Sequence, residues 1–327
     1  MIVLLIVVFF ASLMYGGTKK ISIINVLNVL FCCNKNINNE DIMIIKYIRL
    51  QRTIVSYVVG AGLSVSGLIF QAILKNPMAD PFTLGISGGA ALGVAVAFIF
   101  GLSSIASIFI PLCSFVGMII SIFTVYFTGI KKCFSSKTMI LSGVVVNYIF
   151  SSVVILLFAL SPSKDINFAF MWLIGDFFNF DEKLFFFSII VIFVCIILLF
   201  LFANIINIMY LDNERLKIFG VNIKKNIMFL FFVASIITAA TVSICGIISF
   251  VGLIVPHFVR MIIDTNDNVL VVPLSAFSGA LFLSFCDVLN RMIFSRILIP
   301  IGVIINIVGG FFFICLLLNQ KKNINIY

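Results

Sequence analysis

Long uncharged apolar runs, separated by short polar segments rich in Lys and Arg, make up most of this chain. The apolar positions are continuous over helical lengths, so they predict membrane-spanning helices rather than the alternating strands of a membrane barrel. Since a helix needs ~20 residues to cross ~30 Å of hydrocarbon, the runs divide into about ten spans. The predicted spans are residues 2–15, 54–74, 82–101, 105–130, 138–160, 184–208, 226–246, 248–263, 270–290 and 300–318.

Two of the runs are too long for one crossing. The stretch 82–130 has no charged residue and must hold two spans, with a break between Gly101 and Pro111. The stretch 226–256 is broken near Gly246. Residues 2–15 lack the positive residues and the small-residue cleavage site of a signal peptide, so we interpret them as the first span.

The composition agrees with a membrane protein. Hydrophobic residues make up 63% of the 327 residues and charged residues only 10%, against about 25% charged residues in soluble domains. Mean hydropathy is +1.29. We predict an all-α, polytopic membrane protein with one transmembrane domain over residues 1–327. The net charge of +9 lies in short loops, where it favours a cytoplasmic N-terminus and does not indicate nucleic-acid binding.

Small residues recur at helical spacing within three of the predicted spans, which predicts faces where helices pack closely. A buried amide in the first set can bond across such a contact. The predicted packing residues are Gly60, Ser64, Gly67 and Gln71 in the second span, and Gly85, Gly89 and Gly93 in the third. In the last span, Gly302, Asn306 and Gly310 repeat the spacing.

Candidate chemistry within the spans is sparse. Asp287 is the clearest intramembrane acid, and Arg291 follows it by one helical turn, so a local ion pair is the simplest interpretation. The cysteines have no metal-site spacing, and the single His257 is more typical of a hydrogen-bonded structural residue than of a haem ligand. We therefore predict no catalytic residues, no metal site and no cofactor, and we assign no role to Cys32 or Cys33.

The most polar internal stretch, residues 210–226, lies in a predicted cytoplasmic loop. Asp212 is a good N-cap, Gly220 is a good helix stop, and Leu216 and Phe219 share one face. These features predict a two-turn amphipathic helix. Two interpretations stay open: the helix rests on lipid headgroups, or it inserts into a groove of a partner protein.

Motifs along nearly the whole chain resemble, in order and spacing, the permease subunits of the iron-siderophore, haem and vitamin B12 (FecCD-like) class of ABC importers. The resemblance implies a vitamin B12 permease-like fold of ten helices and a homodimer that works with two cytoplasmic ATPases and one extracytoplasmic binding protein. ATP hydrolysis would then occur on a separate subunit. The motifs are RLQR, GAGLSVSGLIFQAILKNPMADPFTLGISGGAALG, MILSG, WLIGDF, FGVN, GIISFVGLIVPHFVRMI, PLSAFSGALFLSFCDVLNR and IPIGVIINIVGGFFF.

The resemblance also assigns roles to individual residues. Arg49, Arg52 and Arg291 match arginines that dock the binding protein, although Gln51 replaces the usual proline between the first two. We expect them to be solvent-exposed, where ion pairs are worth ~0–1 kcal/mol each and act mainly by steering. Anchoring to lipid headgroups is the other interpretation.

Two further sets match the cytoplasmic side of the family. The predicted ATPase-coupling residues are Asp212, Glu214, Arg215, Leu216, Phe219, Gly220 and Val221. The predicted cytoplasmic gate residues are Asn76, Met78, Ser135 and Ser136.

Together these features predict a multi-pass permease subunit, in a bacterial inner membrane, of a binding-protein-dependent importer for an iron chelate such as a ferric siderophore or haem. A cobalamin permease of the same family is the first alternative. An ion-coupled secondary transporter and a membrane-embedded enzyme are further alternatives, and the scarcity of intramembrane acids and of catalytic groups argues against them. The sequence does not identify the cargo.

Overall fold

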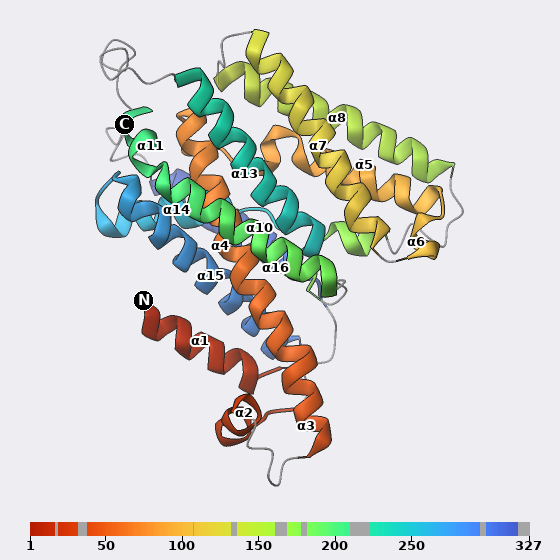
Figure 1. Cartoon of the computed structure of the whole chain (residues 1–327), viewed down its shortest axis with the longest axis vertical. Helices are drawn as coiled ribbons and strands as arrows, with labels where there is room; N and C mark the ends of the chain where they lie inside the picture. Colours follow the sequence, from red (N-terminus) through yellow and green to blue (C-terminus); the bar gives the residue numbers. More distant parts are fainter. Residues whose placement is uncertain are drawn as a thin grey trace.

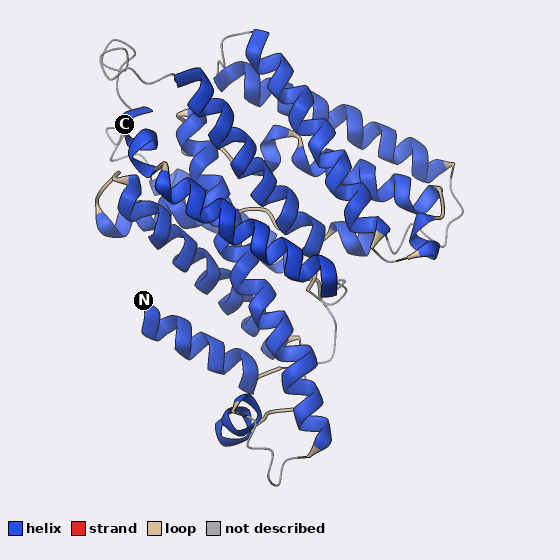
Figure 2. Cartoon of the chain, in the orientation of Figure 1, coloured by secondary structure: helices blue, strands red, loops and turns tan. Residues whose placement is uncertain are grey.

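The computed structural model describes residues 1–16, 19–31, 38–106, 108–131, 136–160, 169–177, 182–209, 223–294 and 299–319. Regular secondary structure within these ranges is entirely helical (Figure 2), which confirms the predicted all-α class. The main elements are α1 (Ile2–Met14), α2 (Ile23–Leu30), α3 (Asn39–Met43), a π-helix η1 (Ile44–Arg49), α4 (Leu50–Leu74), a 3-10 turn η2 (Pro81–Leu84), α5 (Ile86–Ile99), α6 (Leu102–Ile105), α7 (Phe109–Lys131), α8 (Ser136–Ala159), α10 (Glu182–Leu201), α11 (Ala203–Met209), α13 (Ile223–Cys245), α14 (Val251–Ile263), α15 (Asn268–Ile293) and α16 (Ile301–Asn319).

Each predicted span corresponds to a helix or a bent helix pair. Among the described residues, five helices are long and apolar enough to cross a membrane, and α10 with α11 makes a sixth candidate bent by 55°. Four shorter apolar helices, α1, α5, α14 and α16, fill the remaining predicted spans. Helix α4 begins before the predicted residue 54, at Leu50, and η1 leads into it without a break.

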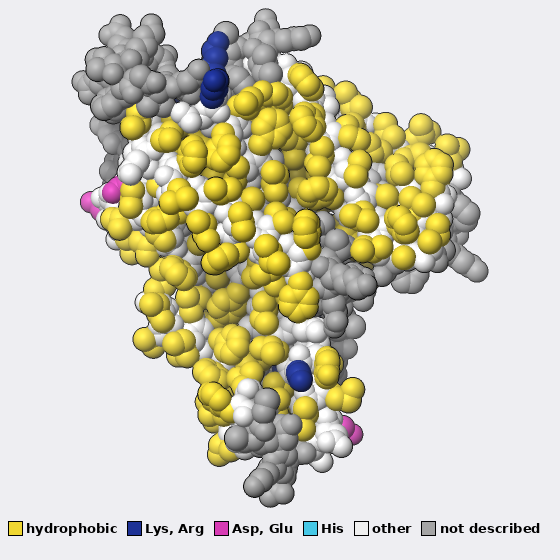
Figure 3. Space-filling model, in the orientation of Figure 1, with side chains coloured by type: hydrophobic (Ala, Val, Ile, Leu, Met, Phe, Trp, Pro, Cys, Tyr) yellow, Lys and Arg dark blue, Asp and Glu magenta, His cyan; other side chains and the backbone are white. Residues whose placement is uncertain are grey.

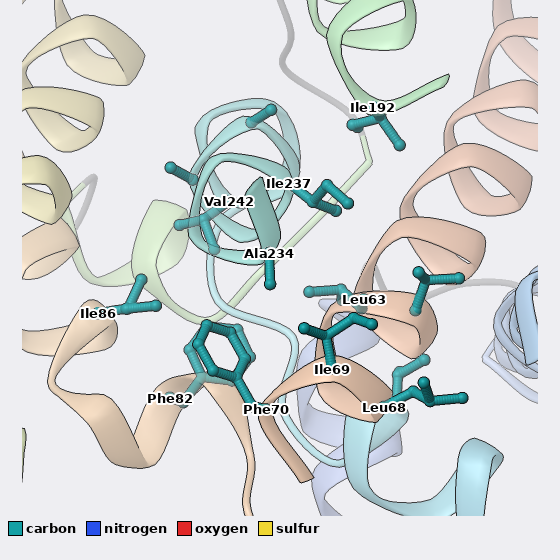
Figure 4. Close-up of a cluster of buried hydrophobic side chains, with 14 of the residues drawn as sticks. Leu63, Leu68, Ile69, Phe70, Phe82, Ile86, Ile192, Ala234, Ile237 and Val242 are labelled. Carbon is teal, nitrogen blue, oxygen red and sulfur yellow. The ribbon is translucent and has the colours of Figure 1, made fainter. Parts of the chain in front are cut away.

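Helix α4 is the centre of the bundle. In the span that contains α4, 78% of the most apolar 18-residue stretch is buried, against 17% of the corresponding stretch of the peripheral α8. Helices α13, α14 and α15 surround it (Figure 1). Figure 4 shows Leu63 and Ile69 of α4 on the side that faces Ala234 and Ile237 of α13, with Phe70 beside Phe82 of η2. The elements that carry the longest motifs therefore form the core.

Glycines let α4 touch its neighbours backbone to backbone. A Cβ on Gly60 would collide with the carbonyl group of Gly279 in α15, and a Cβ on Gly67 would collide with that of Gly252 in α14. In the same way, a Cβ on Gly89 of α5 would lie 2.5 Å from the carbonyl oxygen of Gly117 in α7. Small residues at these positions permit the close helix approach that the spacing predicted.

A second, smaller core lies at one end of the molecule. It is formed by the C-terminal end of α1 together with α2, α3 and η1. Its buried side chains are Leu13, Ile21, Val26, Val29 and Ile45. Figure 1 shows these elements at the lower end, away from α5, α7 and α8. We call this the outer end, because the basic-residue pattern predicts that it faces outside, and we call the opposite end the inner end.

The surface is apolar over most of its area. Figure 3 shows hydrophobic side chains covering the visible face, with Lys and Arg side chains near its upper and lower ends. On α8, Tyr148 and Ile155 are each 70% exposed. Such a surface suits hydrocarbon, because lipid tails solvate apolar side chains that water would not.

Candidate functional site

A buried ionic cluster joins α4 to α15 at the outer end. Arg52 donates from Nε to Oδ1 of Asp287 at 2.8 Å, and its Nη2 lies 2.7 Å from the same oxygen. Arg291 Nη2 lies 3.0 Å from Oδ2 of Asp287. The predicted pair of Asp287 and Arg291 is confirmed. Arg52 is a further partner of Asp287 that was not predicted. It lies 235 positions away in the sequence, and helical spacing relates only residues within the same helix.

Arg49 lies beside this cluster and bonds the end of α1. Its Nη1 donates to the carbonyl oxygens of Leu13 and Met14, at 2.8 Å each. Its Nη2 donates to that of Gly16 at 2.7 Å and also to that of Lys19. A helix end leaves carbonyl groups without intrahelical partners, and this guanidinium supplies donors to two of them.

The expectation that the outer arginines are solvent-exposed is wrong for this chain as described. Arg49 and Arg52 are each 3% exposed, and the side chain of Arg291 is 10% exposed. The physical reason is that α1 folds over Arg49 and Arg291 and offers acceptors, since Arg291 also donates to the carbonyl oxygen of Ser12 at 3.1 Å. Arg52 is buried against Asp287 and Phe177. The docking roles of Arg52 and Arg291 stay predictions.

A junction of non-helical backbone lies next to the cluster. The WLIGDF segment and the break after α13 pair with each other: the N–H of Asp176 donates to the carbonyl of Cys245 at 2.8 Å. The N–H of Gly302, at the start of α16, donates to the carbonyl of Gly175 at 3.2 Å. Gly175 and Gly246 adopt φ of 87° and 72°, which glycine alone adopts freely. Exposed backbone groups are costly inside a membrane protein, and these segments satisfy one another.

Sequence reasoning placed a break near Gly246 but did not find its pairing with WLIGDF. The available signal was a glycine in each segment, and glycine alone does not say which turn meets which. The guanidinium carbon of Arg52 lies 5.8 Å from the ring centre of Phe177, which ends this motif. The junction and the ionic cluster are therefore contiguous.

Strain marks the start of α14. Phe250 precedes the helix with a φ of 68°, a conformation that is rare for a bulky residue. Its ring packs where Gly309 of α16 has no side chain, since a Cβ there would lie 2.6 Å from two Phe250 atoms. The tight packing of α16 thus holds the strained residue in place.

On the inner side, Gln71 of α4 repairs a gap in α14. Pro256 has no N–H, so the carbonyl of Gly252 lacks its intrahelical donor. Gln71 donates from Nε2 to that carbonyl oxygen at 3.1 Å and accepts at Oε1 from Arg260 Nη1 at 2.9 Å. The predicted packing amide therefore makes a specific bond across the contact.

The loop after α4 carries two of the predicted gate residues. Asn76 accepts at Oδ1 from the N–H of Met78 at 2.9 Å, and Met78 is 39% exposed. Asp80 is 7% exposed, and its Oδ1 has no hydrogen-bond partner among the described residues. Burial raises the pKa of Asp80 from 3.8 to about 7. The loop thus contains an exposed Met78 side chain and, two residues later, the buried carboxyl group of Asp80.

The other predicted cytoplasmic residues are only partly described. Ser136 is half-buried at the start of α8, and Ser135 lies outside the described residues. The predicted coupling residues, 212–221, also lie outside them. Within the described parts of the chain, no three His, Cys, Asp or Glu side chains come together in a way that could hold a metal ion.

Comparison with known proteins gives a consistent family. The FecCD transport family model matches residues 4–319. The chain is 34% identical to the cobalamin import system permease protein BtuC of Halobacterium salinarum, over 85% of this chain and 74% of that protein. It is 31% identical to the iron(3+)-hydroxamate import system permease protein FhuG of Bacillus subtilis, over 97% and 95% of the two chains.

A solved structure supports the same fold. It describes an inward-facing conformation of a protein assigned provisionally as a metal-chelate type ABC transporter. The TM-score is 0.83 with 25% identity, over 97% of each chain. The family match covers nearly the whole chain, and the structural likeness covers the same length. The chain belongs to the FecCD transport family.

Proposed function

We propose that the chain is the permease subunit of a binding-protein-dependent ABC importer that carries an iron chelate, such as a ferric siderophore or haem, into the cytoplasm. The observation that carries the proposal is the family match over residues 4–319, in a chain whose helices suit a membrane. The proposed assembly is a homodimer in a bacterial inner membrane, with two ATPase subunits and one extracytoplasmic binding protein.

The proposal includes alternating access driven by ATP. A loaded binding protein docks on the outer end, and closure of the ATPases moves the 212–221 segment. That motion changes the passage near the loop that contains Asn76 and Met78. The exposure of Met78 and the backbone-to-backbone contacts of α4 support this loop as a mobile element on a rigid core.

A cobalamin permease is the first alternative cargo assignment. The relatives named above include an iron(3+)-hydroxamate permease and a cobalamin permease at similar identity, 31% and 34%. Identity of this size does not separate cargoes that are held mainly by another subunit. An ion-coupled carrier is the less favoured alternative.

Reconstitution tests both the class and the cargo. The permease, its ATPase and each candidate binding protein would be placed in liposomes, and uptake of iron-loaded hydroxamate, haem and cobalamin would be compared. We expect uptake of one cargo class that requires both ATP and a binding protein. Uptake driven by a proton gradient without ATP would contradict the proposal.

The coupling segment has its own test. Leu216→Asp with Phe219→Asp places two charges on the face that is proposed to enter an ATPase groove. We expect ATP hydrolysis without uptake, or loss of the ATPase from the purified complex. A variant complex that retains normal uptake would remove this assignment.

A further inference from the structure

We infer that Arg49 is a staple that fastens the C-terminal end of α1 to the bundle, and that it does not belong to the surface that an acidic partner meets. The first half rests on contacts within this chain. The second half rests on the proposed function, because a docking partner is expected only for an importer.

The staple is built from the fork shape of the guanidinium. Arg49 donates to four carbonyl oxygens, two in the last turn of α1 and two in the segment that follows. Lys has one compact ammonium group with three donors and cannot span such a set. Charge alone therefore cannot replace Arg49 at this position.

The packing around Gly16 supports the same role. A Cβ on Gly16 would lie 2.9 Å from Nε of Arg49 and 3.2 Å from Nη1 of Arg291. The chain thus passes directly over both guanidinium groups. This close approach requires a residue without a side chain and leaves Arg49 covered.

Arg291 also bonds the end of α1, where it donates to the carbonyl oxygen and to the hydroxyl oxygen of Ser12. Ser12 and Thr53 share a hydroxyl–hydroxyl bond of 2.6 Å, and Tyr57 donates to the carbonyl of Leu5 at 2.7 Å. The N-terminal half of α1 is exposed, with Val3 at 72%. Figure 1 shows α1 beside α15, and it also contacts the outer part of α4. Its polar attachment is therefore concentrated at the end that Arg49 holds.

The segment after α1 is held from two sides. The carbonyl oxygen of Lys19 accepts a hydrogen bond from Arg49, and Nζ of Lys19 lies 2.6 Å from Oδ1 of Asp41. The hydrogen bond to Asp41 raises the pKa of Lys19. Within the described part of the outer end, Lys20 and Lys46 are exposed, whereas Arg49 is covered. A partner that approaches from outside meets these lysines first.

Trypsin cleavage after Lys19 and Lys20 measures the staple, because a protease needs this segment to leave its bonded conformation. The variants are Arg49→Gln, which removes the charge, and Arg49→Lys, which keeps it. We expect both to speed cleavage at these two sites by ~10-fold, since each loses several charge-assisted bonds. Quantitative mass spectrometry of the purified protein gives the rate.

Lys46→Gln is the matched control, since it removes one positive charge from the same short element, η1, at an exposed position. We expect its cleavage rate to stay at the wild-type value. A wild-type rate in Arg49→Gln would overturn the staple. If Arg49→Gln does not fold, Gly16→Val pushes the same guanidinium away, and a wild-type cleavage rate there would overturn it equally.

The claim that Arg49 lies outside the docking surface is tested by the rate at which the binding protein that supports uptake associates with the permease. For folded variants, we expect equal rates for wild type, Arg49→Lys and Arg49→Gln. A loss of rate in Arg49→Gln that Arg49→Lys restores would assign Arg49 to the docking surface. If no binding protein associates with the wild-type chain, the proposed function fails, while the trypsin result still decides the staple.

Discussion

The polar groups at the two ends of α4 differ in how their charges are balanced. At the outer end, Asp287 lies between Arg52 and Arg291 and pairs with both, and Arg49 donates its hydrogen bonds to backbone carbonyls. At the inner end, Arg260 bonds a neutral amide, and the buried Asp80 has an oxygen without a hydrogen-bond partner among the described residues.

This difference suggests different mechanical roles. Separating a buried ion pair leaves an uncompensated charge and is strongly unfavourable. Exchanging the neutral amide partner of Arg260 costs less, because no buried counter-ion is left unpaired when that bond breaks. The outer cluster is therefore suited to hold helices together, and the inner cluster is suited to rearrange. Each of the following predictions can break or sharpen that contrast.

Asp287→Asn should have the largest effect. The change keeps the side-chain shape but leaves two buried guanidinium groups without their counter-ion, at a cost of about 3–5 kcal/mol. Thermal unfolding of the purified protein measures it. A matched inner-end variant, Asp80→Asn, should be far better tolerated. Equal losses of stability in the two variants would remove the contrast.

Gly67→Ala should come next, because the new methyl group collides with the backbone of Gly252. Overpacking of this kind typically costs about 1–3 kcal/mol. Gly310→Ala is the control, since no described atom lies within 4 Å of its added Cβ. We expect a lower melting temperature only for Gly67→Ala. Similar melting temperatures would mean that α4 and α14 separate easily.

Gln71→Leu should cost about 1–3 kcal/mol, since it leaves the Gly252 carbonyl and Arg260 without their partner. Pro256→Ala restores an N–H in α14 that can bond the same carbonyl. In a double-mutant cycle, the loss from Gln71→Leu should therefore shrink when Pro256→Ala is present. Additive losses of unfolding free energy would show that the Gln71 amide does not replace the N–H donor that Pro256 lacks.

The buried carboxyl group of Asp80 gives the inner end a pH dependence. Its folded pKa of about 7 lies above its ordinary value of 3.8, so the folded state keeps a proton that the unfolded chain releases. The unfolding free energy should therefore fall as pH rises between about 4 and 7, and then level off. Melting temperatures across this window should change less in Asp80→Asn. Identical slopes would contradict a buried, protonated Asp80.

Much of the fold follows from the sequence because hydrophobic run length directly measures the membrane crossing. The predicted spans match helices, and the small-residue face of Gly60 and Gly67 lies against other helices as the spacing required. Helical periodicity reports which residues share a face. It does not report which distant helix that face meets.

The outer arginines show where such reasoning stops. Their positions at the outer ends of α4 and α15 predicted exposure, since charged residues at span ends usually reach water. The burial of Arg49 depends on α1 folding back, and on carbonyls of Leu13 and Met14 that only the folded chain presents. A tertiary partner of this kind leaves no local signal in the sequence.

The separation of Arg52 from Asp287 has a consequence for synthesis. The two residues are 235 positions apart, so α4 leaves the ribosome long before its counter-ion exists. At ~5–20 residues per second, the interval is on the order of ten to fifty seconds. During that time, the outer end of α4 must keep a solvated arginine at the membrane surface. The ion pair can close only when α15 arrives, which makes it a late step of assembly.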